Sequence, residues 1–163
     1  MTAKPIQVIS ADLTLNAHAA AVLYLLDDYA KDPAGGGQGL SDYAKSNLIS
    51  AMKSRSSMFS VLAYDGDQPV GLVNAIESFS TFACKPLVNV HDVSVLASYR
   101  GQGIAKKMIT RIADIARKRG AVKLTLEVLS GNQSAMKAYK DLGFAGYELN
   151  GSMGQAQFMQ LML

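Results

Sequence analysis

The spacing of apolar and polar residues divides the chain into alternating helical and strand-like segments. Apolar residues recur every three or four positions in four segments, which predicts helices at residues 13–32, 40–54, 104–120 and 132–143. Shorter alternating or continuous apolar runs predict strands at residues 5–10, 58–65, 69–79, 87–96, 122–129, 144–149 and 155–163. Hairpins followed by a helix between strands predict an α/β (α+β) fold, in which a mixed central sheet is flanked by about four helices.

Residues that favour helix ends stand at the borders of these segments. Thr14 or Asn16 is a candidate cap of the first helix, and Ser41 of the second. Gly120 and Gly143 follow the third and fourth helices, at the position where glycine commonly ends a helix. These signals indicate that the helices end within the chain's polar connections.

Composition narrows the class of protein. The 163 residues are 49% hydrophobic and 18% charged, which predicts one folded domain over residues 1–163. A net charge of +3 is too small to predict a nucleic-acid partner, and no apolar run is long enough to predict a membrane partner. Cys84 is the single cysteine, and with two histidines it predicts neither a disulfide nor a metal site. We expect a cytoplasmic protein, because the first residues lack the apolar core of a signal peptide.

The stretch "SYRGQGIAKKM", residues 98–108, places two glycines directly before a predicted helix. Glycine lets backbone N–H groups approach a ligand, and the first turn of a helix has unpaired N–H groups that favour phosphate. The stretch matches neither common nucleotide motif: Lys and Ser or Thr do not follow Gly103, and Lys106 stands where a dinucleotide fingerprint has its third glycine. Either a phosphate site or a plain strand-to-helix turn fits these residues.

Two motifs decide between these alternatives. The pattern Arg100-x-x-Gly103-x-Ala105 is followed, after a predicted helix and strand, by Asn132, Ala135, Tyr139 and Gly143-Phe144. In this order they resemble the GCN5-related N-acetyltransferase (GNAT) superfamily, with partial similarity to its spermidine/spermine N-acetyltransferase-like members. The resemblance implies that the loop binds the pyrophosphate of acetyl-coenzyme A (acetyl-CoA).

The resemblance also assigns the other contacts to the cofactor. Backbone groups of Val93 and Val95 would bind the pantetheine arm, and a bulge near them would open the strand to admit it. Asn132 would bind the arm too, although a plain role as a helix cap fits it equally. The cofactor-binding residues implied are Val93, Val95, Arg100, Gly101, Gln102, Gly103, Ile104, Ala105, Lys106 and Asn132.

By the same resemblance, the protein is an acyltransferase that moves an acetyl group to a primary amine, by direct attack through a tetrahedral intermediate. Tyr139 would protonate the leaving thiolate, with a packed aromatic as the alternative. His91 or Glu127 would accept the proton of the amine, and a strand histidine bonded to Asp92 is the alternative for His91. On an ideal strand, His91 and Asp92 would face opposite sides.

The acceptor is expected to be a small amine or a polyamine. His91 stands where the polyamine enzymes have Glu, which argues against polyamine specificity. The alternatives are a protein N-terminal acetyltransferase and a non-catalytic acetyl-CoA-binding sensor module. The apolar final run at residues 158–163 could pair with a second copy in a homodimer.

Overall fold

The computed structural model describes residues 5–148 and 150–163, which divide into two compact units between Leu126 and Glu127. The first unit holds a five-stranded sheet in the order β1-β2-β3-β4-β5. Its strands are β1 (Gln7–Ser10), β2 (Met58–Asp65), β3 (Gln68–Ser80), β4 (Lys85–Val95) and β5 (Leu124–Leu126). Neighbours pair antiparallel except β4 and β5, which pair parallel, so the predicted mixed sheet is confirmed. A single domain over residues 1–163 stays a prediction.

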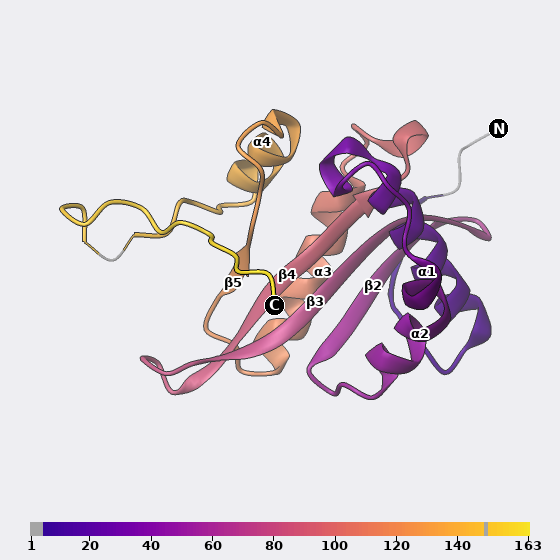
Figure 1. The fold of residues 1–163 in the computed structure, drawn as a ribbon, viewed down its shortest axis with the longest axis horizontal. Helices are drawn as coiled ribbons and strands as arrows, with labels where there is room; N and C mark the ends of the chain where they lie inside the picture. The colour runs from indigo at the N-terminus through magenta and orange to yellow at the C-terminus, as the bar shows by residue number, and fades with distance from the viewer. Residues whose placement is uncertain (1–4, 149) are drawn as a thin grey trace. The chain divides into compact units, whose positions relative to one another are not determined.

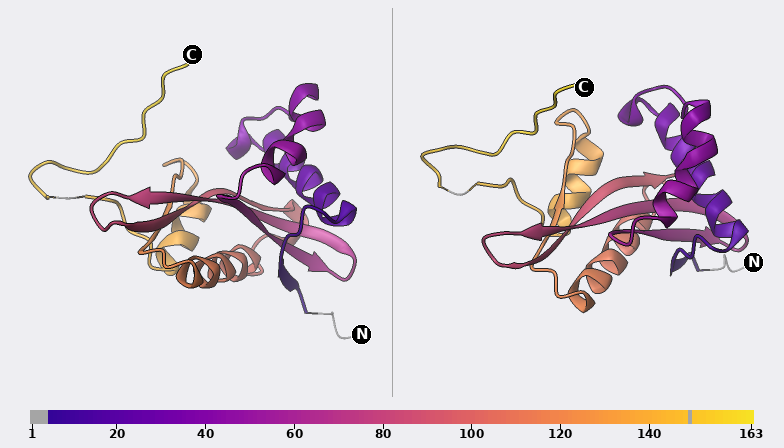
Figure 2. Two further views of the ribbon diagram at one scale, coloured as in Figure 1. Left: turned by 90° about the horizontal axis from the view of Figure 1, so that it is seen from below. Right: turned by 60° about the horizontal axis from the view of Figure 1, so that its bottom comes forward.

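Helices cover both faces of this sheet (Figures 1 and 2). One face carries α1 (Asn16–Lys31) and α2 (Asp42–Lys53), and the other carries α3 (Ile104–Lys118). Two short 3-10 turns, η1 (Pro33–Gly35) and η2 (Ala97–Tyr99), follow α1 and β4. Together with α4 of the second unit, these helices confirm the predicted α/β class.

The core of the first unit lies on both sides of the sheet. On α3 the predicted apolar stripe is buried, including Ile104, Met108 and Ile112. At Gly71 a Cβ would come within 2.9 Å of the Met108 methyl carbon, so a larger residue there would have to displace the end of the Met108 side chain between β3 and α3. On the other face α1 buries Val22 and Leu25. Burial of such side chains is the main favourable term in folding, so the contacts of these helices with the sheet stabilise the first unit.

A bulge in β4 changes which face its residues occupy. Ala75 of β3 pairs with Val90 but Asn74 pairs with Asp92, so His91 is an extra residue. Val90 aligns through Ala75 with Phe59, whose ring lies under the guanidinium of Arg119 just after α3. Asp92 aligns with the neighbouring row and therefore lies on the opposite face, which carries α1. Val90 and Asp92, which would share a face on an ideal strand, thus lie on opposite faces, and the expectation that His91 and Asp92 face opposite sides stays a prediction.

The second unit contains α4 (Gln133–Asp141), and the strands predicted after it are wrong. The residues described in 144–148 and 155–163 form no strand, and Leu149 lies outside the described residues. One backbone hydrogen bond, from Ala156 N to Tyr147 O at 2.9 Å, joins the two segments. Apolar alternation alone makes no strand, because each strand needs a neighbour to satisfy its backbone groups.

Three smaller expectations also changed. The strand predicted at 122–129 is only β5, because pairing with β4 stops at Val90, where the bulge begins. Neither Thr14 nor Asn16 caps α1, whose N-cap residue is Leu15; the Thr14 hydroxyl donates instead to Asp12. Ser41 is confirmed as the cap of α2, since its Oγ accepts from Ala44 N at 3.1 Å.

Candidate functional site

The turn between η2 and α3 collects unpaired backbone N–H groups. Gly101 and Gly103 have φ angles of 76° and 74°, a left-handed conformation that favours glycine. The backbone N–H groups from Gly101 to Lys106 donate to no acceptor in the part of the chain that the structure describes; Lys107 N is the next donor, to Gly103 O. No acidic residue stands in the first turn of α3, and Lys106 and Lys107 are exposed. This combination is typical of an anion site.

Tyr99 holds the start of this turn against the β2–β3 hairpin. Its hydroxyl donates to Asp65 Oδ2 at 3.1 Å and to Gln68 Oε1 at 3.3 Å. The hydrogen bond to the Asp65 carboxylate raises the pKa of Tyr99, because it stabilises the protonated hydroxyl. The loop is therefore anchored before its glycines begin.

Arg100 braces the turn from the other side. Its Nε donates to Val95 O at 3.0 Å, and its Nη2 forms an ion pair with Asp32 Oδ2 at 2.8 Å. The pKa of Asp32 is lowered, first by the hydrogen bond from Ala34 N and then by Arg100. The Asp32 carboxylate thus offsets part of the Arg100 charge, and a direct contact of Arg100 with a phosphate stays a prediction.

The edge of β4 beyond the bulge has lost its strand neighbour. Pairing with β5 ends at Val90 and Leu126. Leu96 N donates to Val70 O on β3, and hydrogen-bonded positions alternate along an antiparallel pair. The backbone groups of Val93 and Val95 therefore face away from β3, toward the side of the sheet that β5 no longer covers. This is the arrangement expected of an edge that binds an extended ligand.

His91 lies at the bulge with its side chain exposed. The structure does not show the hydrogen bond between His91 and Asp92 that was the alternative explanation for this histidine; Asp92 Oδ2 accepts from Asn74 Nδ2 at 3.0 Å instead. His91 is thus placed beside the open edge of β4, with its imidazole accessible.

The remaining predicted residues, Glu127, Asn132 and Tyr139, belong to the second unit. Asn132 Oδ1 accepts from Ala135 N at 3.1 Å and so caps α4, the structural role considered for it. The Tyr139 ring packs edge-on against Phe144, with centroids 6.0 Å apart. Glu127 is exposed and follows β5 instead of lying within a strand. The first unit thus contains the turn, the open edge of β4 and His91. Glu127, Asn132 and Tyr139 belong to the second unit.

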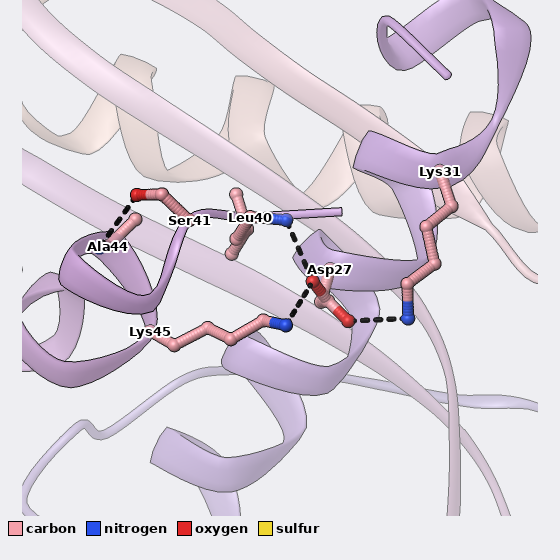
Figure 3. A network of polar contacts seen from close by, with 6 residues as sticks. All are labelled: Asp27, Lys31, Leu40, Ser41, Ala44 and Lys45. Atoms are coloured by element: carbon pink, nitrogen blue, oxygen red, sulfur yellow. Dashed lines mark hydrogen bonds and ion pairs between the residues drawn. The ribbon is translucent and has the colours of Figure 1, made fainter. Parts of the chain in front are cut away.

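An ionic cluster fixes the connection between α1 and α2 (Figure 3). Asp27 accepts from Lys31 Nζ at 2.6 Å and from Leu40 N at 2.8 Å, and Lys45 Nζ lies 3.4 Å from it. The hydrogen bonds from Lys31 and Leu40 hold the pKa of Asp27 at about 2. The ion pair with Lys31, four residues further along the same helix, has the spacing that the sequence could indicate, whereas the hydrogen bond from Leu40, 13 residues away, could not be foreseen.

A pocket of about 370 Å³ lies between the β1–α1 connection, the end of α2 and the start of β2, and none of the predicted site residues lines it. Over residues 5–148 and 150–163, no group of His, Cys, Asp and Glu side chains could hold a metal ion. None of the described helices is long and apolar enough to cross a membrane.

A mixed sheet with helices on both faces, a bulged strand and a turn of unpaired N–H groups before a helix together define an α/β protein with a candidate anion site. The chain belongs to the acetyltransferase (GNAT) family, which it matches over residues 20–144. The match confirms the predicted family.

Curated relatives share part of this chain. It is 33% identical over 100 residues to streptothricin acetyltransferase of Streptomyces lavendulae, a match that covers 61% of this chain and 50% of that protein. It is 41% identical over 66 residues to thialysine N-epsilon-acetyltransferase of Bos taurus, covering 40% of this chain and 38% of that protein. The chain thus spans about half or less of the length of these relatives.

The fold matches solved structures over nearly the whole chain. One is AAC(6′)-Iy in complex with the bisubstrate analogue CoA-S-monomethyl-acetylneamine, with a TM-score of 0.77 and 17% identity over 98% of this chain and 100% of that one. At this identity the likeness establishes the fold alone.

Proposed function

We propose that this protein transfers the acetyl group of acetyl-CoA to the primary amine of a small molecule. The observation that carries the proposal is the row of unpaired backbone N–H groups from Gly101 to Lys106, in a chain of the GNAT family. Beyond membership of the family, the proposal specifies the acetyl donor, the chemical class of the acceptor and the residues that take part in the transfer.

The residues present fit the cofactor. The N–H groups of the turn suit the oxygens of a pyrophosphate, and at Gly101 and Gly103 the space where a side chain would begin is empty within 4 Å. Val93 and the N–H of Val95 lie on the unpaired edge that an amide-containing arm requires, whereas Val95 O already accepts from Arg100 Nε at 3.0 Å. When bound, acetyl-CoA would supply a thioester, an acyl group activated for attack by an amine. Lys106 adds positive charge beside the turn.

The acceptor amine must lose a proton before it can attack, because an ammonium ion has no free electron pair. His91 is the base that we favour, since it lies exposed at the bulge, beside the open edge of β4. Glu127 is the second candidate base. Tyr139 is the proposed acid that returns a proton to the leaving sulfur, and its position against Phe144 fixes its ring.

The names of two relatives support a small-molecule acceptor, whereas a third relative is named N-alpha-acetyltransferase 30. Streptothricin and thialysine are the acceptors that the two names give. We therefore propose a small amine in preference to a protein N-terminus.

The proposal is tested by measuring free thiol release from acetyl-CoA with purified protein and a panel of polyamines, arylalkylamines, aminoglycosides and N-terminal peptides. We expect one class of small amine to stimulate release well above the rate without amine, with one acetyl group found on the amine per thiol released. Stimulation by peptides alone would replace the acceptor class. Tight binding of acetyl-CoA with no release by any amine would instead support a sensor module and contradict the proposed activity.

A further inference from the structure

A row of polar side chains crosses the sheet and ends at the bulge. Ser60, Asn74 and Asp92 are direct neighbours on β2, β3 and β4. Ser60 Oγ donates to Asn74 Oδ1 at 2.6 Å, and Asn74 Nδ2 donates to Asp92 Oδ2 at 3.0 Å. Ser60 and Asn74 are 3% and 2% exposed, so the row is buried up to the carboxylate. The Ser60 hydroxyl fixes the orientation of the amide, which must then present its NH₂ group to Asp92.

The carboxylate at the end of this row has no cation beside it. Asp92 is partly buried, and among the residues that the structure describes no ion pair includes it. Removing a charge from water is unfavourable unless a partner compensates for it. A purely structural link to Asn74 would need only a neutral side chain such as Asn. An unpaired carboxylate here indicates that its charge serves a ligand.

The surroundings of Asp92 leave its negative charge uncompensated. On the same face, Tyr29 of α1 has a raised pKa, first because of burial and then because of the charges of Asp92 and Asp32. The Asp32 charge is itself offset by Arg100, 2.8 Å away. His91, the residue before Asp92, is the base proposed above.

We infer that Asp92 binds a positively charged group of the acceptor, other than the amine that is acetylated, and that Asn74 and Ser60 are positioning residues that hold its carboxylate. The inference rests on the proposed function, whose acceptor it specifies. A carboxylate stabilises an ammonium ion and so opposes its deprotonation, which makes Asp92 unsuited to the reacting nitrogen. Because Cα atoms of consecutive residues are about 3.8 Å apart, His91 and Asp92 would hold two nearby groups of one molecule. The acceptor class is therefore a short amine with a second positive charge.

The test compares two probes of equal length, 1,3-diaminopropane and 3-amino-1-propanol, which differ in the second charge. Their binding to the protein with saturating coenzyme A is measured by calorimetry. We expect the diamine to bind about tenfold to a hundredfold more tightly, as for a hydrogen bond to a charged group, and Asp92→Asn to bring the ratio within about twofold. Equal binding of both probes to the wild-type protein, or an unchanged ratio in Asp92→Asn, would overturn the inference.

Two further variants distinguish the contribution of the negative charge at Asp92 from that of the hydrogen bonds in the row. Asn74→Asp with Asp92→Asn keeps every donor and acceptor of the row but moves the carboxylate to a buried position, so the preference for the diamine should stay lost. Its recovery would show that the hydrogen bonds, and not the charge at Asp92, matter. Asn74→Ala should lower the ratio of the two affinities, whereas a merely structural defect would weaken both probes equally.

Thiol release and probe binding, measured on the same samples, distinguish a failure of this inference from a failure of the proposed function. Thiol release with any amine of the panel, combined with equal binding of the two probes, leaves the acetyltransferase standing and refutes the role of Asp92. A diamine preference that depends on Asp92, without thiol release, refutes the transfer reaction and leaves the binding site. The melting temperature and coenzyme A affinity of each variant confirm that it is folded.

Discussion

The glycine turn before α3 offers a test in which two nearly identical substitutions have different consequences. Gly103 and Gly120 flank the same helix, with φ angles of 74° and 78°, and an added Cβ meets nothing within 4 Å at either position. The change is Gly103→Ala, with Gly120→Ala as the matched control. At 1.5 Å per residue the two positions lie roughly 20 Å or more apart along the axis of α3.

The cost to folding should be the same for both. A residue with a Cβ in the left-handed conformation loses roughly 1–2 kcal/mol, and for a chain of 163 residues each kcal/mol lowers the melting temperature by about 2–4 °C. Only at Gly103 does the methyl group enter the space beside the N–H groups of residues 101–106. Losing one hydrogen bond to a charged phosphate costs about 1.5–3 kcal/mol, which raises the dissociation constant of acetyl-CoA about tenfold to a hundredfold.

The assay pairs calorimetric titration of acetyl-CoA with thermal unfolding of each variant. We expect similar losses in melting temperature, a dissociation constant raised only in Gly103→Ala, and wild-type affinity in Gly120→Ala. Equal affinities in the two variants would refute the assignment of the turn to the cofactor. Weakened binding in both would show that the effect comes from loss of stability and not from the turn.

Two further predictions concern the acid and the ionic cluster. Tyr139→Phe keeps the contact with Phe144 but removes the hydroxyl, so kcat should fall roughly a hundredfold while the affinity for acetyl-CoA stays within about twofold. Steady-state kinetics and calorimetry check this, and an unchanged kcat would remove Tyr139 from the chemistry. The pKa of Asp27 is lowered from 3.8 to about 2, so its ion pairs stabilise the fold fully above pH 3.8 and are lost as the pH falls toward 2. In acid unfolding, the stability difference between the wild-type protein and Asp27→Asn should shrink over that range, and a difference independent of pH would contradict it.

The elements of the first unit were largely predictable because their patterns are local. The strand predicted at 58–65 is β2, and the third helix differs from α3 only at its C-terminal end. The prediction failed where an element depends on its neighbour. The runs at 144–149 and 155–163 have the alternation of strands, yet hydrogen-bonding partners along a sheet cannot be read from that alternation.

In the candidate site, too, the features set by neighbouring residues could be predicted and those set by distant residues could not. The glycine turn was visible in the sequence, because glycine and the following helix suffice to predict a cluster of N–H groups. The row through Ser60, Asn74 and Asp92 was not, since its members are 14 and 18 residues apart and are joined only by the register of three strands. The ion pair of Arg100 with Asp32 bridges 68 residues and was equally hidden. A bulge near Val93 and Val95 was expected from the family resemblance and is confirmed, but its exact position at His91 follows only from the register.

The extra residue in β4 also means that changes of length and changes of identity act differently at this place. Losing the codon for His91 would leave an unbroken strand in which Val90 still pairs with Ala75 and Asp92 with Asn74. The carboxylate and the side chains that follow it would keep the partners and the faces that they have now. No single substitution removes the bulge in this way. In a gene that drifts by both kinds of change, loss of this one codon would remove the proposed base and leave the strand pairs on either side of it in register.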